Sequence, residues 1–299
     1  RPAWSSDRVQ LPDGFAIGPT TAPEVDVLVG WAADEGWNPG LHDVAIAYRE
    51  QPAAFLALRR GSELVGGASV MAYGEAWGFL GLFILRADLR SQGLGTCLWG
   101  ELLASLRDRL APDAPIGLDG VVAMQPFYRR SGFVDAYRDI RFSGHPVCAA
   151  DPQVVVLEGV QLTPAGEREL VAYDEALALG PRRSFMRHWF TAPGVLVATL
   201  RHTTGLGAIG AMRPCREGFK LGPVLAATPD DAARVVRSLA AHAHGALVQL
   251  DVPEPNAAGV AIAAELGLEQ SFECARMYLG PMPEIAVHRV FGVTSFELG

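Results

Sequence analysis

Lysine is almost absent from this chain of 299 residues, because Lys220 is its single lysine. The formal net charge at pH 7 is −8, since 33 acidic residues outnumber 25 basic ones. Nucleic-acid binding depends on clustered lysines and arginines that neutralise phosphates, so this composition argues against a nucleic-acid partner. A Walker A loop for ATP is also disfavoured, because it requires Gly-Lys-Ser/Thr and Lys220 follows Phe219 and precedes Leu221.

Long apolar runs and paired cysteines are missing as well. No stretch approaches the roughly 18 apolar residues of a membrane span, and the first residues lack the apolar core of a signal peptide. The four cysteines are scattered without a C-x-x-C pair, and no Cys/His/Asp cluster accompanies His242 and His244. We therefore expect a cytoplasmic protein without membrane contact, metal or disulfide framework, and long enough for two domain cores.

The segment LRADLRSQGLGTCLWGEL (85–102) joins two different patterns. Before it lies an apolar run typical of a buried strand, and after it leucines recur at helical spacing. Gly93 and Gly95 would let a ligand approach the unpaired N–H groups at the helix start, which favours a phosphate site. A dinucleotide fingerprint is excluded, because Leu98 stands where its third glycine belongs. An ordinary glycine turn remains the alternative.

Two motifs together indicate a family. The loop Arg90-Ser-Gln-Gly-Leu-Gly95 resembles the Arg/Gln-x-x-Gly-x-Gly/Ala loop of the GNAT superfamily of N-acetyltransferases. Further along, FYRRSGF (127–133) is similar to the segment that follows the fifth strand of that fold. Residues 55–85 alternate strand-like runs with turns, as the preceding antiparallel strands should. The resemblance covers residues 16 to about 142 and implies acetyl-CoA as the co-substrate.

The resemblance also implies roles for individual residues. The loop would hold the pyrophosphate of acetyl-CoA, and the fourth strand would pair with the pantetheine arm and polarise the thioester carbonyl. The cofactor-binding residues are then Phe83, Ile84, Leu85, Arg90, Ser91, Gln92, Gly93, Leu94, Gly95 and Thr96. Tyr128 stands where the family has a tyrosine beside the CoA sulfur, so we expect it to assist the departing thiolate. A packed aromatic ring with a bonded hydroxyl is the alternative role.

The second half of the chain repeats features of the first. The segment 248–280 compares with 116–144, and GFKLGPVL (218–225) compares with GFLGLFIL (78–85). A Leu-Asp pair opens each of the longer segments. The separation from Gly132 to Arg141 equals that from Gly267 to Arg276. These correspondences indicate a tandem GNAT protein.

We predict an α/β (α+β) fold of two GNAT-type modules. Each module would be a mixed, mostly antiparallel twisted sheet flanked by helices, and the resemblance implies a V-shaped splay between its strands 4 and 5. The N-terminal module would span 1–146, bind acetyl-CoA and be catalytic. A degenerate GNAT-like module would span 154–280, and a tail at 281–299 would pack on the fold.

The second module departs from the chemistry of the first. In place of the glycine loop it has AATPDD (226–231), whose two carboxylates at a helix start would repel a pyrophosphate. Ala263 stands at the position of Tyr128. Asn256 stands where many GNAT modules have an asparagine that contacts CoA, whereas the first module has Val121 there. The N-terminal module is therefore the catalytic candidate.

The sequence defines the site for the acceptor amine and its general base less well than the cofactor site. Phe79 stands where many family members carry a glutamate. The candidate acceptor-site residues are Trp37, Asn38, His42, Asp43, Glu75, Asp119 and Lys220. Glu75, Asp119, His42 and Asp43 are the candidate bases, and a water relay is the alternative. The acids and tryptophan of 34–43 could receive a cationic amine, or could form a solvated helix end over a packed ring.

Lys220 has two interpretations. It is either a surface lysine, or a buried side chain paired with a carboxylate of the protein, such as Asp251 or Glu254, or of a substrate. We expect it to be at least partly buried and paired, because period-2 alternation points it away from its apolar neighbours.

The sequence thus predicts an acetyl-CoA-dependent N-acetyltransferase that acts on an amine of a small molecule or peptide. The second module would shape substrate binding or assembly, and a homodimer is compatible with this arrangement. A different class of function is the alternative: a non-catalytic acyl-CoA sensor or interaction protein. The missing carboxylate at Phe79 favours the alternative, and Tyr128 opposes it.

Overall fold

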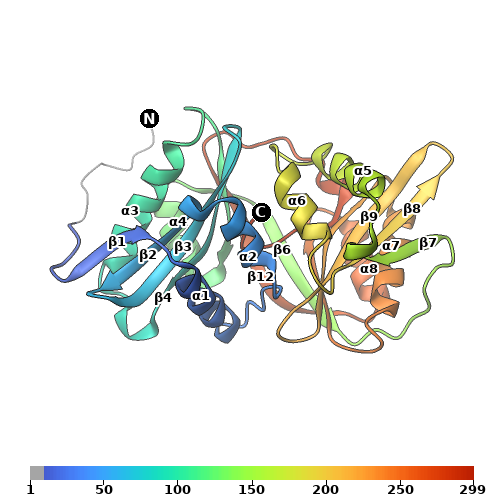
Figure 1. The fold of residues 1–299 in the computed structure, drawn as a ribbon, viewed down its shortest axis with the longest axis horizontal. Helices are drawn as coiled ribbons and strands as arrows, with labels where there is room; N and C mark the ends of the chain where they lie inside the picture. The colour runs from blue at the N-terminus through green and yellow to red at the C-terminus, as the bar shows by residue number, and fades with distance from the viewer. Residues whose placement is uncertain (1–9) are drawn as a thin grey trace.

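The computed structural model describes residues 10–299 (Figure 1). The N-terminal half consists of β1 (Phe15–Pro19), α1 (Ala22–Asp34), α2 (Asp43–Glu50), β2 (Phe55–Arg60), β3 (Glu63–Tyr73), β4 (Trp77–Leu85), α3 (Leu94–Arg107), β5 (Ile116–Val121), α4 (Gln125–Arg130) and β6 (Val134–Gly144). The C-terminal half consists of β7 (Val154–Glu158), α5 (Pro164–Glu175), α6 (Arg183–Phe190), β8 (Leu196–His202), β9 (Gly205–Pro214), β10 (Phe219–Ala226), α7 (Pro229–Ala241), β11 (Val248–Pro253), α8 (Ala257–Glu265), β12 (Glu269–Leu279) and β13 (Val290–Gly292).

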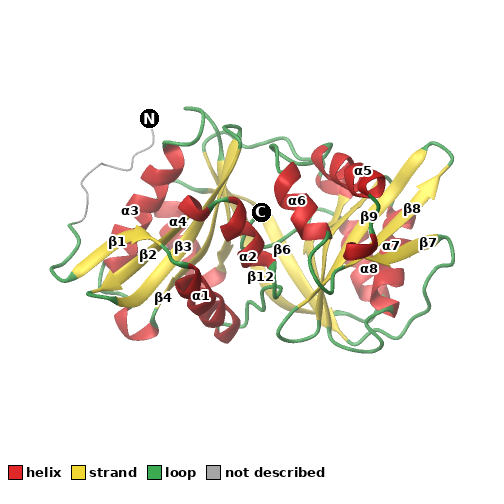
Figure 2. Ribbon diagram, in the orientation of Figure 1, coloured by secondary structure: helices red, strands yellow, loops and turns green. Residues whose placement is uncertain are grey.

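The strands of the described residues join in one 13-stranded sheet, with helices against it (Figure 2). Its order is β1-β2-β3-β4-β5-β12-β6-β11-β10-β9-β8-β7, and β13 pairs with β10. Only the pairs β4–β5 and β10–β11 are parallel among the pairings of these residues. The predicted mixed, mostly antiparallel sheet flanked by helices is confirmed.

Hydrophobic cores lie on both faces of the sheet. On one face α1, α2, α5 and α6 share a core that runs through both halves, in which Trp189 and Phe55 are completely buried. On the other face α3 and α4 pack on the N-terminal half around Trp99, and α7 and α8 pack on the C-terminal half. No helix within residues 10–299 is long and apolar enough to cross a membrane.

The two halves of the chain exchange their long last strands. In the sheet, β12 of the C-terminal half lies between β5 and β6, and β6 of the N-terminal half lies between β12 and β11. Figure 1 shows both strands in the middle of the molecule, between the two sets of helices. Each half therefore completes its part of the sheet with a strand that belongs to the other half.

Two buried ion pairs join the exchanged strands to the opposite halves. Arg276 on β12 lies opposite Asp119 on β5, with Nε–Oδ1 and Nη2–Oδ2 distances of 2.6 and 2.8 Å. Arg141 on β6 lies opposite Asp251 on β11, and the corresponding distances are 2.7 and 2.8 Å. None of the four side chains is more than 7% exposed. These aspartates and arginines occupy corresponding positions in the two copies of the internal repeat. The residues that the two copies share therefore form the contact between the halves.

We expect Asp251→Ala to reduce the free energy of unfolding by about 3–5 kcal/mol, because it leaves the Arg141 guanidinium buried without its carboxylate. Glu254→Ala is the matched control, since Glu254 forms an exposed ion pair with Arg138 next to the same strand. This control should leave the unfolding midpoint nearly unchanged, because exposed pairs contribute little. Urea unfolding followed by circular dichroism measures both variants, and equal effects of the two would contradict a special role for the buried pair.

Candidate functional site

A cavity of about 590 Å³ opens where β4 and β5 separate. The two strands pair only from Gly78–Leu80 to Ile116–Leu118, and beyond this point the β4 edge that faces β5 lines the cavity. A bulge lies at the same place, because Ile84 pairs with Gly67 whereas Gly81 pairs with Ser69, and Leu82 has a φ of 48°. This is the V-shaped splay that the family resemblance implies, and the predicted residues Phe83, Ile84 and Leu85 lie on its wall.

The glycine loop forms one end of the cavity. Gly93 is the residue before α3 and has a φ of 81°, and an added Cβ there would meet nothing within 4 Å. The first N–H groups of a helix have no intrahelical partner, so this loop presents free donors to the space in front of Gly93. Arg90, Ser91, Gly93, Gly95 and Thr96 line the cavity. The space and the donors fit a pyrophosphate.

Two loop residues that were predicted to bind the cofactor lie outside the lining of the cavity. Gln92 Nε2 donates a hydrogen bond to the Asp88 carbonyl oxygen at 2.9 Å, and Leu94 is buried against the neighbouring core. The Arg90 guanidinium is fixed by two acceptors, the Leu85 carbonyl oxygen at 2.9 Å and the Glu35 carboxylate. The loop therefore faces the cavity mainly with its backbone.

Tyr128 on α4 lines the cavity and is 6% exposed. Its ring lies 5.2 Å from that of Trp99, and Gly120 leaves room for it, because an added Cβ would lie 3.0 Å from the ring. Burial raises the pKa of the Tyr128 phenol above its usual value, so the hydroxyl keeps its proton at neutral pH. Cys274 of β12 lines the same cavity, and burial raises the pKa of its thiol well above the usual range.

Of the predicted acceptor-site residues, Trp37 and Asp119 line this cavity. Trp37 lies between α1 and α2, and its carbonyl oxygen accepts a hydrogen bond from Arg141 Nη1 at 2.7 Å. Asp119 already forms the ion pair with Arg276. Burial raises the pKa of the Asp119 carboxyl, and the Arg276 guanidinium lowers it. A carboxylate bonded in this way is a weak candidate for a free base.

The other predicted acceptor-site residues lie outside the lining of the cavity. Asp43 is buried in an ion pair with Arg213, and His42 lies beside it in a separate small hollow. Asn38 Nδ2 donates hydrogen bonds to Gln249 Oε1 and to the carbonyl oxygen of residue 217. Glu75 is exposed in the turn between β3 and β4. These side chains hold segments together or face solvent, because the turn at 34–43 is folded onto the C-terminal half.

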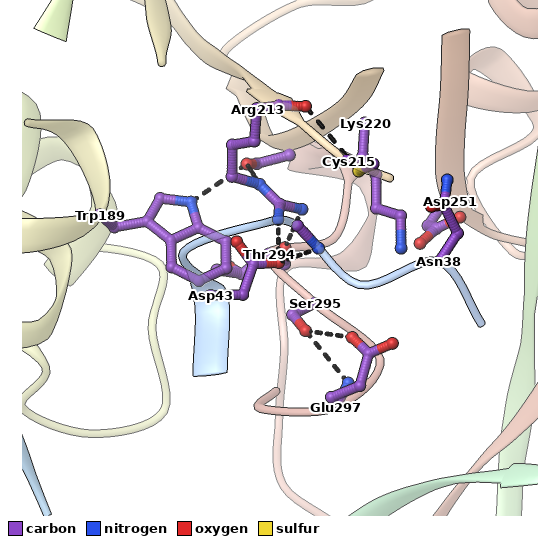
Figure 3. Close-up of polar contacts among 12 residues, drawn as sticks. Asn38, Asp43, Trp189, Arg213, Cys215, Lys220, Asp251, Thr294, Ser295 and Glu297 are labelled. Carbon is purple, nitrogen blue, oxygen red and sulfur yellow. Dashed lines mark hydrogen bonds and ion pairs between the residues drawn. The ribbon is translucent and has the colours of Figure 1, made fainter. Parts of the chain in front are cut away.

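Lys220 is 1% exposed, so its predicted burial is confirmed, although β10 is buried on both faces after Phe219. Its Nζ donates to the Trp37 carbonyl oxygen at 3.3 Å, and Figure 3 shows the side chain extended between Cys215 and Asp251. The predicted pairing with Asp251 is wrong, because Asp251 is bonded to Arg141, and no other ion pair of Lys220 occurs in the described chain. Burial lowers the pKa of the Lys220 ammonium, and the nearby Arg141 charge acts in the same direction.

The C-terminal half has an equivalent splay, but the chain itself fills it. β10 and β11 pair only from Phe219–Leu221 to Val248–Leu250, and β10 bulges immediately afterwards. There β13 pairs with β10, and the Val293 N–H donates to the Asp251 carbonyl oxygen at 2.9 Å. Asn256 Nδ2 donates to the Val290 carbonyl oxygen at 2.8 Å. The asparagine that the resemblance would assign to CoA contact thus holds the protein's own strand.

After β13 the tail continues into the cavity of the N-terminal half. Phe296 and Glu297 line that cavity, and both are less than a tenth exposed. The Glu297 carbonyl oxygen lies directly against Gly81 of β4, where an added Cβ would come within 1.8 Å of it. Phe272 and Cys274 of β12 add a second contribution from the C-terminal half. Sequence reasoning missed these four residues, and only the apolar character of VFGVTSF indicated that the tail packs on something.

Comparison with known proteins agrees with this geometry. Two family models, both described as an acetyltransferase (GNAT) domain, match residues 37–148 and 170–292. Together the two matches cover most of the chain. The protein therefore belongs to the GNAT acetyltransferases, and it is a tandem member with two such domains.

Similar proteins extend over the full length of the chain. Holothin acyltransferase of Pseudoalteromonas sp. (strain SANK 73390) is 25% identical over 94% of this chain and 93% of its own length. A putative acetyltransferase from Pyrococcus horikoshii superposes with a TM-score of 0.79 at 22% identity, over 97% of this chain and 98% of its own. A tandem GNAT protein from the clavulanic acid biosynthesis pathway has a TM-score of 0.63 at 15% identity, over 90% and 99%. The two solved structures share the tandem fold.

We expect acetyl-CoA to bind once per chain. The double substitution Gly93→Glu and Gly95→Glu should abolish binding, because carboxylates at this helix start block and repel a pyrophosphate. Ala227→Glu is the matched control, since Ala227 is exposed just before α7 in the C-terminal half, and it should leave the affinity unchanged. Isothermal titration calorimetry with acetyl-CoA measures both. Two equivalent sites, or binding that survives the double substitution, would contradict this assignment.

Proposed function

We propose that this protein transfers an acetyl group from acetyl-CoA to an amine of a small molecule or peptide, and that the N-terminal half carries out the reaction. One observation carries the proposal: the open splay of β4 and β5 brings the glycine loop and Tyr128 to a single cavity. The corresponding splay of the C-terminal half is filled by β13, which supports one active site per chain.

The chain's own groups can perform each part of the transfer. Within residues 10–299 the edge of β4 beyond Leu80 has no strand partner on the β5 side, so its backbone groups are available to the pantetheine arm and the thioester carbonyl. The amine nitrogen attacks the carbonyl carbon, a C–N bond forms and the C–S bond breaks. The attacking nitrogen loses one proton to solvent. The departing thiolate takes the proton that Tyr128 holds, and the resulting phenolate is reprotonated from solvent.

The relative of similar length supports a small-molecule acceptor, because it is named for the acylation of holothin. At 25% identity this supports a first choice of probe, and holothin is that choice. The full chain would be mixed with acetyl-CoA and holothin, tryptamine or a lysine-containing peptide, and acceptor-dependent CoA release would be measured with a thiol reagent. Mass spectrometry of the acylated product would identify the acceptor class.

A non-catalytic acyl-CoA sensor is the second candidate. It is favoured by the side chain of Phe79, which is fully buried under the Arg276 guanidinium and gives β4 no carboxylate at this position. A sensor would bind acetyl-CoA without acceptor-dependent release. Binding without turnover for every amine of the panel would therefore replace the proposed transferase activity.

We expect Tyr128→Phe to lower kcat by about 10²-fold, the typical size of one acid contribution, without changing the affinity for acetyl-CoA. Because burial raises the Tyr128 pKa, this contribution should persist throughout the assay range from neutral pH to about pH 9. Tyr48→Phe is the matched control, since the Tyr48 hydroxyl bonds the Thr20 carbonyl oxygen away from the cavity. An unchanged kcat for Tyr128→Phe would assign the ring to packing.

A further inference from the structure

The cavity wall has three carboxylates within the described chain, and their partners differ. Glu35 is paired with Arg90 at the glycine loop. Asp119 is paired through both oxygens with Arg276. Glu297 forms no ion pair within residues 10–299, and its side chain accepts from Ser295 Oγ, at 2.5 Å on Oε2. Its other oxygen, Oε1, accepts no hydrogen bond from these residues.

The backbone fixes the place of Glu297. The Glu297 N–H donates to Ser295 Oγ at 3.1 Å, so the serine hydroxyl closes a small ring with the glutamate (Figure 3). The carbonyl oxygen of the same residue lies against Gly81, at the bulge where β4 leaves β5. Glu297 therefore lies beside the part of the splay that the proposed function assigns to the thioester, opposite the end that holds the glycine loop.

Positive charges near Glu297 have other partners. Arg141 is held by Asp251, and its guanidinium lies over the rings of Phe272 and Phe296 at 5.6 and 5.0 Å from their centroids. Lys220 donates to the Trp37 carbonyl oxygen. Its ammonium and the Arg141 guanidinium attract the Glu297 carboxylate from beyond ion-pair distance. A carboxylate that is 4% exposed and has no cation in contact among the described residues is costly in a protein interior. Such a group is suited to receive a cation from a ligand.

We propose that Glu297 binds the acceptor's ammonium group and takes its proton, and that the acceptor is a primary amine on a small, flat, apolar molecule. The inference rests on the proposed transferase function. The cavity lining favours this class, because Phe272, Phe296 and Trp37 line the same cavity as Glu297. The C-terminal half thus supplies the acceptor end of the active site, and the N-terminal half supplies the acetyl-CoA end.

Every proton of this step can be accounted for. The ammonium gives one proton to Glu297 Oε1, and the neutral nitrogen then attacks the thioester carbon with its lone pair. The C–S bond electrons leave with sulfur, which takes the Tyr128 proton. The second proton lost from nitrogen passes to solvent, as does the one on Glu297, and the phenolate of Tyr128 regains one from solvent. The products are the amide, CoA thiol and one proton per ammonium consumed.

Transfer to two amines of different charge can distinguish a catalytic role of Glu297 from a purely structural one. Tryptamine is a flat aromatic primary amine that is charged at pH 7, whereas hydroxylamine is uncharged there and needs no base before it attacks. We expect Glu297→Gln to lower kcat/KM for tryptamine by about 10²-fold at pH 7, and for hydroxylamine by less than about threefold. The loss with tryptamine should shrink as the pH rises, because free amine becomes available in solution. The affinity for acetyl-CoA should be unchanged.

Glu284→Gln is the matched control, because Glu284 is exposed on the same C-terminal segment and outside the cavity. Equal losses with the two amines, or no loss with either, would overturn the role of Glu297. Transfer to hydroxylamine and the lysine peptide but not to tryptamine would overturn the acceptor class alone. Failure of the wild-type protein with every amine would instead reject the proposed function.

A second measurement covers the case in which Glu297→Gln does not fold. In the wild-type protein, kcat/KM for tryptamine should show an acid limb that kcat/KM for hydroxylamine lacks after correction for its own protonation, because only tryptamine needs a base. Identical acid limbs for both amines would overturn the proposal without any variant. Glu297→Asp should keep part of the tryptamine activity that Glu297→Gln loses, because it retains a carboxylate.

Discussion

The bidentate ion pairs of two buried arginines, Arg276 with Asp119 and Arg141 with Asp251, hold the exchanged strands in place. A guanidinium that is almost completely buried is strongly destabilising without its carboxylate, so each last strand is stable beside the half to which it does not belong. The consequence reaches the cavity of the N-terminal half. With β12 beside β5, Cys274 lines the cavity of the N-terminal half, and the chain that follows remains close enough to enter it.

The strands separate in both halves, but a strand of the chain fills only the splay of the C-terminal half. In both halves a parallel pair of strands separates after three residues, and the strand before the helix bulges. Backbone groups exposed by such a splay require partners. In the C-terminal half β13 supplies them, Asn256 secures that strand, and Thr228 caps α7 by accepting from the Asp231 N–H. The N-terminal splay keeps its groups open beside a glycine loop. The open splay therefore lies in the N-terminal half, and the splay of the C-terminal half is filled by the chain's own strand.

The turn between α1 and α2 is positioned by the C-terminal half. Asn38 bonds Gln249, Asp43 pairs with Arg213, and Lys220 and Arg141 both donate to the Trp37 carbonyl oxygen. These contacts satisfy polar groups that would otherwise be buried without partners. They also place the Trp37 side chain on the wall of the cavity. The site is therefore built from both halves on two sides, by this turn and by the tail.

The sequence by itself determined the parts that are continuous in the chain. The strand, glycine turn and helix around Gly93 follow from local pattern, and so does the repeat that includes Asp119 and Arg276. The tertiary structure alone decided which strands pair, because β6 and β12 have similar patterns and either could lie beside either half. That choice brought residues from the end of the chain to Gly81. The position of Glu297 depended on it, since no local pattern relates a residue in an irregular tail to a bulge more than two hundred residues earlier.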